Sequence, residues 1–94
     1  MADLNGMFEL TIETVRKAVS SLDSNDHELA REVAEKEDMI DKMERKLRKK
    51  HILRLNEGLC SGQAGIVFVD IISNLERIGD HAVNIAEAVL GENE

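Results

Sequence analysis

The residues best suited to chemistry in this 94-residue sequence are two pairs of carboxylates. Each pair has the pattern acid-x-x-x-Asp, formed by Glu37 with Asp41 and by Glu76 with Asp80. A spacing of four residues places both carboxylates of a pair on one face of a helix. On a helical wheel, Glu44 lies beside the first pair. Either pair alone is weak evidence for a site, because acids at this spacing are common on solvated helices.

The two pairs lie at equal distances from a turn that begins at Gly58. The first pair is centred on residue 39 and the second on residue 78, so the midpoint falls between residues 58 and 59. In an antiparallel hairpin folded at this turn, both pairs come to the same height. The helical angles also place the acids beside the apolar stripes rather than opposite them. The sequence therefore predicts four or five carboxylates converging at a partly buried level.

Converging carboxylates repel one another, and burying them without partners is costly. A divalent or trivalent cation would remove the repulsion, and oxygen ligands suit hard ions such as Mg, Mn, Ca or Fe, with Zn also a candidate. A solvated acidic surface that binds no ion is the alternative. The residues alone leave both interpretations open.

Other residues give little indication of catalysis. Cys60 lies in the turn region with no base near it in the sequence, and His81 is expected to be a solvated surface residue. Because no nucleophile–base pair and no open metal site can be argued from the sequence, we predict that the chain is not an enzyme.

The elements that must position the acids are helices. The chain has no proline, tryptophan or tyrosine and only two phenylalanines, which excludes most β-sandwiches and barrels. Apolar residues recur with helical period in three segments, over about residues 4–22, 25–56 and 63–90. Short connections between long helices favour antiparallel neighbours. The prediction is one all-α domain over residues 1–94, a three-helix up-down-up antiparallel bundle.

Within these segments the periodicity predicts which residues face the core and where the helices are capped. Asn25 and Glu28 are predicted to form a capping box at the start of the second helix, and Gly91 to cap the third. Folding the first helix back onto the second places Met7 beside Ile40. The apolar stripe expected to face inward on the first helix consists of Leu4, Phe8, Thr11, Val15, Ala18, Val19 and Leu22, widened by Ile12.

The first helix is expected to be about half as long as the second, which leaves the far end of the helix two–helix three hairpin uncovered. Such an apolar end should not be bare in water. We expect either self-association there, as a homodimer or higher oligomer, or coverage by a segment upstream. The predicted interface residues are Leu47, Ile52, Leu55, Phe68 and Val69.

Half of the cations lie at this same end of the hairpin. A solvated helix face is one explanation, and contact with an acidic partner or an anionic membrane surface is the other. The basic patch consists of Arg45, Lys46, Arg48, Lys49, Lys50 and Arg54.

The charge and composition of the chain limit which partners and which cellular compartment are expected. The formal net charge is −7 and aromatic stacking groups are scarce, so no nucleic-acid partner is expected. The longest apolar run, over residues 66–72, is far shorter than a membrane span. A single cysteine suits a reducing compartment, which predicts a cytoplasmic protein, at the inner face of the membrane if a partner or a parent chain holds it there.

Two motifs resemble those of a known family. The run from Asn74 to Glu87, NLERIGDHAVNIAE, is similar to the signature of the PhoU family of phosphate-uptake regulators. The stretch His51-x-x-Arg54-Leu55-Asn56-x-Gly58-x-Cys60, followed by Ala64-Gly65, resembles the PhoU-like cytosolic domain of bacterial Na/Pi-cotransporter proteins. The likeness extends over essentially the whole chain.

The resemblance implies a function and a set of ligands. In that family, three-helix units carry E/D-x-x-x-D motifs that bind metal clusters, and PhoU proteins act with phosphate transporters and a signalling kinase. By resemblance, Glu76 and Asp80 match one motif and Glu37 and Asp41 the other, whereas Glu44 comes from the helical wheel alone. PhoU proteins carry two such units in tandem, and this chain has one.

Two hypotheses follow. The first is a non-enzymatic, metal-binding regulatory module of phosphate transport that contacts a membrane transporter component or a signalling protein. The alternative is a structural homo-oligomerisation bundle whose carboxylates bind nothing.

Overall fold

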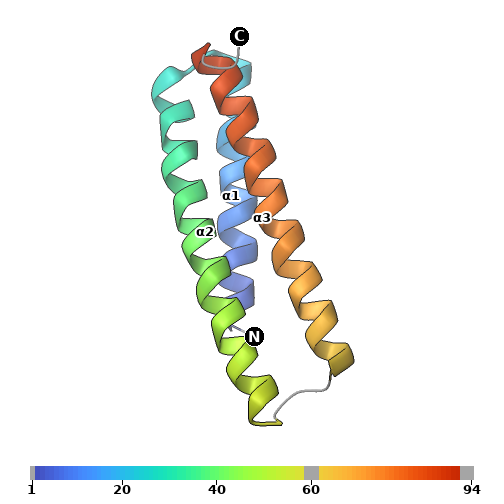
Figure 1. The fold of residues 1–94 in the computed structure, drawn as a ribbon. Helices are drawn as coiled ribbons and strands as arrows, with labels where there is room; N and C mark the ends of the chain where they lie inside the picture. Colours follow the sequence, from blue (N-terminus) through green and yellow to red (C-terminus); the bar gives the residue numbers. More distant parts are fainter. Residues whose placement is uncertain (1, 59–61, 92–94) are drawn as a thin grey trace.

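The computed structural model describes residues 2–58 and 62–91, which form three antiparallel helices (Figure 1). Helix α1 spans Ala2–Ser24, α2 spans His27–Asn56 and α3 spans Gly62–Leu90. The predicted all-α up-down-up bundle is confirmed, and its helix boundaries lie within two residues of the expected ones. Cys60, for which no catalytic part was expected, lies outside the described residues.

The turn between α1 and α2 differs from the predicted capping box. Asn25 has a positive φ of 51°, and Asp26 is the N-cap, whose side chain accepts a hydrogen bond from the Leu29 N–H at 3.1 Å. An Asn tolerates the left-handed conformation better than most residues, so Asn25 makes the turn and its neighbour caps the helix. After the last residue of α3, Gly91 has a φ of 76°, as expected for a C-cap.

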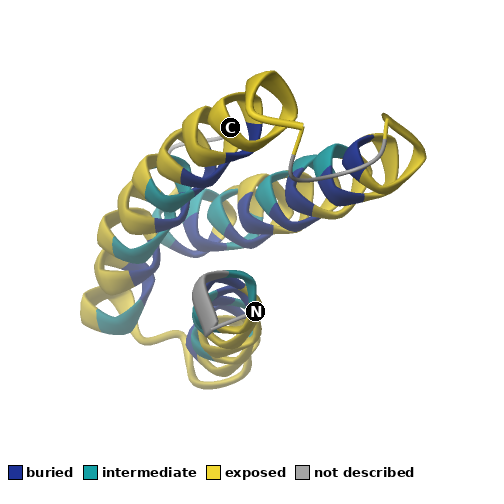
Figure 2. Ribbon diagram, turned by 90° about the horizontal axis from the view of Figure 1, so that it is seen from below, coloured by how far each residue is buried: buried dark blue, intermediate teal, exposed yellow. Residues whose placement is uncertain are grey.

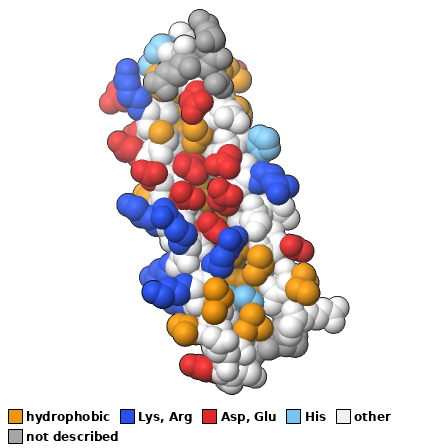
Figure 3. All heavy atoms as spheres, viewed as in Figure 1, with side chains coloured by type: hydrophobic (Ala, Val, Ile, Leu, Met, Phe, Trp, Pro, Cys, Tyr) orange, Lys and Arg blue, Asp and Glu red, His pale blue; other side chains and the backbone are white. Residues whose placement is uncertain are grey.

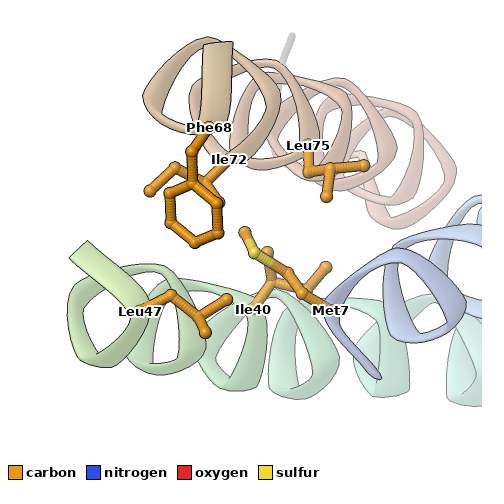
Figure 4. Close-up of a cluster of buried hydrophobic side chains, with 6 residues drawn as sticks. All are labelled: Met7, Ile40, Leu47, Phe68, Ile72 and Leu75. Atoms are coloured by element: carbon orange, nitrogen blue, oxygen red, sulfur yellow. The ribbon is translucent and has the colours of Figure 1, made fainter. Parts of the chain in front are cut away.

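The core consists of two apolar clusters along the bundle axis. The first joins all three helices and brings Met7 against Ile40, as predicted (Figure 4). Its buried members are Met7, Ile40, Leu47, Phe68, Ile72 and Leu75. The second lies nearer the α1–α2 turn and is built from smaller side chains: Ala18, Ala30, Val33, Ala82, Ala86 and Val89.

Helix α1 is rotated relative to the prediction. Phe8, Val19 and Leu22 were expected to face inward, but their exposed fractions are 50%, 52% and 58%. The residues one position earlier, Met7 and Ser21 among them, are buried instead. Figure 2 shows the buried residues on the sides of the helices that face one another. Two adjacent stripes on α1 both have helical spacing, so periodicity alone did not identify the inner one.

The far end of the α2–α3 hairpin extends beyond α1, as Figure 1 shows. Helix α1 has 23 residues against 30 in α2, so it is longer than the half-length that was expected. An open hollow of about 440 Å³ lies at this tip, and its lining includes Ile52, Leu55 and Val69.

Two of the predicted interface residues belong to the core instead. Leu47 and Phe68 are only 5% and 8% exposed, because they pack within the first cluster. Phe68 also stacks on His51, with ring centroids 4.9 Å apart. The exposed apolar surface of the tip comes from the predicted residues Ile52 and Leu55 together with Leu53, Ile66 and Val67.

Over the part of the chain that the structure describes, no helix has the length and apolar character needed to cross a membrane.

Candidate metal centre

Three carboxylates from two helices meet on one face of the bundle. Glu37 of α2 and Glu76 and Asp80 of α3 each offer one oxygen, and these oxygens all lie within 4.8 Å of one another. Glu37 and Glu76 are partly buried, whereas Asp80 is exposed. Figure 3 shows acidic side chains gathered at one level across α2 and α3. We call these three residues the carboxylate triad.

A glycine lets the two helices approach closely at this level. A Cβ atom on Gly79 would lie 3.3 Å from Cδ1 of Ile40 and 3.7 Å from Cγ of Glu37. The absence of a side chain at Gly79 therefore leaves room for Ile40 and the stem of Glu37 between the helices. A glycine inside a helix costs up to about 1 kcal/mol, and close packing beside the triad offsets that cost.

The pKa values of Glu37 and Glu76 are raised above the ordinary range of a glutamate. The pKa of Glu37 is raised from 4.5 to about 7, first by partial burial and then by the negative charges of Asp41 and Asp80. Partial burial also raises the pKa of Glu76, followed by repulsion from Asp80, Glu44 and Asp41. These shifts have the direction expected where carboxylates share one site without a compensating positive charge.

The other two predicted ligands lie nearby but outside the triad. Asp41 forms an ion pair with Arg45, with 3.7 Å between the side-chain nitrogen and oxygen. Glu44 is buried and forms a much shorter one with Arg48, at 2.7 Å. Both ion pairs join residues at i,i+4 spacing, a pattern that can be read in the sequence. Each of these acids therefore already has a cation beside it.

The donor set of the triad fits a hard multivalent cation. Its ligands are carboxylate oxygens from rigid helices, the ligand type that Mg²⁺, Ca²⁺ and Mn²⁺ prefer. Within residues 2–58 and 62–91, no Lys or Arg forms an ion pair with Glu37, Glu76 or Asp80. The three carboxylates thus leave oxygen atoms and negative charge available to an ion.

Part of the predicted basic patch forms ion pairs with neighbouring acids. Besides pairing with Glu44, Arg48 donates a hydrogen bond to Oγ of Ser73 on α3 at 3.2 Å. Lys46 and Lys49 of α2 are exposed toward the tip. Figure 3 shows Lys and Arg side chains next to the acidic level, toward the tip. Arg45 and Arg48 of the predicted patch therefore neutralise acids within the chain.

Comparison with known proteins identifies the class of this three-helix unit. The PhoU domain pattern matches residues 4–89, nearly the whole chain. The chain therefore belongs to the PhoU family.

Three relatives illustrate the similarity. The PhoU homolog 1 of Thermotoga maritima, a phosphate-specific transport system accessory protein, is 36% identical over 90 residues, covering 96% of this chain and 39% of the relative. Accessory proteins of the same name from Xylella fastidiosa and Clostridium acetobutylicum are 33% and 27% identical, covering 95% and 94% of this chain and 38% and 42% of theirs. The chain spans about two fifths of the length of the curated relatives it matches. No solved structure matches the chain significantly.

Proposed function

We propose that this chain is a metal-binding regulatory unit of phosphate transport that acts through protein contacts and catalyses no reaction. The observation that carries the metal-binding part is the carboxylate triad. Carboxylate oxygens of the three acids lie within 4.8 Å of one another, and none of the three acids forms an ion pair with a Lys or Arg that the structure describes. Two of the three have raised pKa values.

Glu37, Glu76 and Asp80 are the residues that would hold the ion. A bound divalent or trivalent cation would supply positive charge and no redox or hydrolytic step, and it would join α2 to α3 at this level. Asp41 and Glu44 would contribute negative potential to the site, since both raise the pKa of Glu76. The oxygen-only donor set favours Mg²⁺, Ca²⁺, Mn²⁺ or iron over softer metals, with Zn²⁺ a weaker candidate.

The phosphate-transport part rests on the family. The relatives are named as accessory proteins of the phosphate-specific transport system. By that kinship, the partner of this unit is a component of a phosphate transporter or of its signalling pathway, in the cytoplasm. The exposed cations Lys46 and Lys49 of α2 offer positive charge to an acidic surface on such a partner.

Calorimetric titration with Mn²⁺ tests the metal-binding part. We expect the metal-free protein to bind Mn²⁺ and the Glu76→Gln/Asp80→Asn double variant to lose roughly 100-fold or more in affinity, because two of three ligands become neutral. The matched control is Asp38→Asn, which removes an exposed carboxylate from α2 outside the triad. Equal binding by the double variant and the control would contradict the assignment.

Phosphate uptake in cells tests the regulatory part separately. In a bacterium that lacks its own PhoU protein, expression of this chain should change the rate of labelled phosphate uptake, and the double variant should not. Metal binding without any effect on uptake would retain the site and overturn the proposed regulatory role.

A further inference from the structure

Charge is distributed unevenly along this elongated bundle, whose longest dimension is 49 Å. Residues 45–73, from the last turns of α2 to the first turns of α3, contain six Lys and Arg residues against two acids, a formal net charge of +4 with His neutral. The rest of the chain carries −11. Arg45 and Arg48 form ion pairs with Asp41 and Glu44 outside this segment, and the segment is still positive without them. The tip is therefore the basic end of an acidic protein.

The same end carries exposed aliphatic side chains. Ile52, Leu53 and Leu55 of α2 and Ile66 and Val67 of α3 are each at least 40% exposed. Because consecutive residues of a helix are turned by about 100°, the three α2 residues point in different directions around the helix. The hollow at the tip is lined by Ile52, Leu55 and Ile66 but not by Leu53 or Val67. The exposed apolar surface thus extends around the tip and does not form a single stripe.

Three kinds of side chain follow one another toward the tip. On the face that Figure 3 displays, the acidic level comes first, then Lys and Arg side chains, and then hydrophobic side chains. Lys46 and Lys49 are exposed. With a helical rise of about 1.5 Å per residue, Lys49 lies about 6 Å and Lys46 about 10 Å from Leu53 along the axis of α2.

We propose that the hairpin tip binds the surface of an anionic lipid bilayer, with its aliphatic side chains among the acyl chains and Lys46 and Lys49 at the phosphate groups. Interfacial helices bury apolar groups about 5–10 Å into the boundary between headgroups and acyl chains, which matches the separation of Leu53 from the two lysines. Clustered Lys and Arg residues are attracted to anionic lipids. The acidic remainder of the chain is repelled by the same surface, so the tip is the end that approaches it.

The arrangement of the apolar residues favours a bilayer over a protein as the occupant. A helix or groove of another protein contacts one stripe, and it would leave the apolar side chains on the other sides of the tip in water. A bilayer is fluid and surrounds an inserted tip on all sides. A second copy meeting this one tip to tip would set Lys46 and Lys49 against their equivalents, whereas lipid phosphate groups attract them.

This inference goes beyond the proposed function and does not rest on it, because no residue of the carboxylate triad lies at the tip. The chain itself would contact lipid, whether or not a protein partner also holds it at the membrane. Lipid binding is therefore measured on the metal-free protein.

Cosedimentation of the full chain with lipid vesicles, in the presence of a chelator, tests the inference. We expect binding to phosphatidylcholine vesicles that contain about 30% phosphatidylglycerol, weakened by salt, and far weaker binding to pure phosphatidylcholine. Lys46→Gln/Lys49→Gln should weaken the binding roughly 30-fold, because two cations at the lipid surface are lost. The matched control, Arg16→Gln/Arg31→Gln, removes two exposed cations away from the tip and should not weaken it.

An introduced tryptophan reports on insertion, since the chain has no tryptophan of its own. The fluorescence emission of Leu53→Trp should shift to shorter wavelength when anionic vesicles are added, because the indole leaves water. Met39→Trp changes an α2 residue of nearly equal exposure, 51% against 54%, and its emission should not shift. Helical circular dichroism should be equal in all variants.

Two results would overturn the proposal. One is a chain that does not bind anionic vesicles, and its retention on immobilised polyglutamate instead would assign the tip to an acidic protein surface. The other is vesicle binding without a shift in the emission of Leu53→Trp, because the chain would then be adsorbed by charge alone.

Discussion

Two neighbouring groups of carboxylates, one on α2 and one shared by α2 and α3, differ in the charges beside them. Asp41 and Glu44 each have an arginine one helical turn away, at 3.7 and 2.7 Å. The carboxylate triad has no such partner among the described side chains, and two of its members have raised pKa values. Uncompensated negative charge, rather than the number of acids, therefore marks the candidate site.

The largest expected difference between the two groups is in stabilisation by metal. At a Mn²⁺ concentration 100 times the dissociation constant, binding should raise the free energy of unfolding by about 2.7 kcal/mol. Glu37→Gln should abolish most of this increment, because it removes the ligand that α2 contributes. Asp41→Asn should retain most of it. Chemical denaturation with and without Mn²⁺ measures both, and equal losses in the two variants would remove the distinction.

The second difference concerns the arginines themselves. Arg48→Met should lower the free energy of unfolding by about 1–2 kcal/mol, because it leaves the buried carboxylate of Glu44 without its charged partner. Arg45→Met should cost only a few tenths of a kcal/mol, since its pair with Asp41 is longer and solvent-exposed. Urea denaturation of the metal-free variants gives both values. A larger cost for Arg45→Met would reverse the ranking.

The third difference is a pH dependence that belongs to the triad. Because the pKa of Glu37 is raised from 4.5 to about 7, the folded protein holds a proton that the unfolded chain has already released between these values. This group's contribution therefore lowers the free energy of unfolding as the pH rises from about 4.5 to 7, and it is constant above that range.

Glu37→Gln isolates this contribution. Without metal, the variant should be more stable than the natural chain at pH 8 by about 1 kcal/mol, after allowance for solvent screening, and the difference should vanish near pH 5. Thermal unfolding at the two pH values measures it. A variant less stable at pH 8 would show that the charge of Glu37 is compensated in the fold.

The smallest expected effect is that of Asp41 on metal affinity. Asp41→Asn should weaken Mn²⁺ binding by less than about tenfold, because Asp41 acts through its potential and not as one of the three ligands. Calorimetric titration beside Asp80→Asn gives the comparison. If Asp41→Asn weakens binding as much as Asp80→Asn does, Asp41 is a ligand.

Much of the fold was predictable because its determinants are local. Three helices in the observed order follow from the helical period, the absence of proline and the glycines at residues 58, 62 and 65. The two acid pairs, centred on residues 39 and 78, lie at equal distances from the turn, which predicted their common height because an antiparallel hairpin preserves distance along the chain.

The rotation of α1 and the division of the acids were not predicted. Two adjacent stripes on α1 have the same spacing. One contains Met7, Thr11 and Ala18, and the other contains Phe8, Ile12 and Val19. Only packing against α2 and α3 selects the inner one. The inner stripe contains Thr14 and Ser21, which hydropathy ranks below Phe8 and Leu22. The arginines beside Asp41 and Glu44 were a readable signal, since both lie at i,i+4.

Anomalous diffraction from crystals of the full chain soaked with Mn²⁺ would locate a metal ion at the carboxylate triad. A peak within coordination distance of Glu37, Glu76 and Asp80 is the predicted result, with Asp41 and Glu44 still paired to their arginines. A peak elsewhere, or no peak from crystals soaked at saturating Mn²⁺, would contradict the assignment of the carboxylate triad as a metal site.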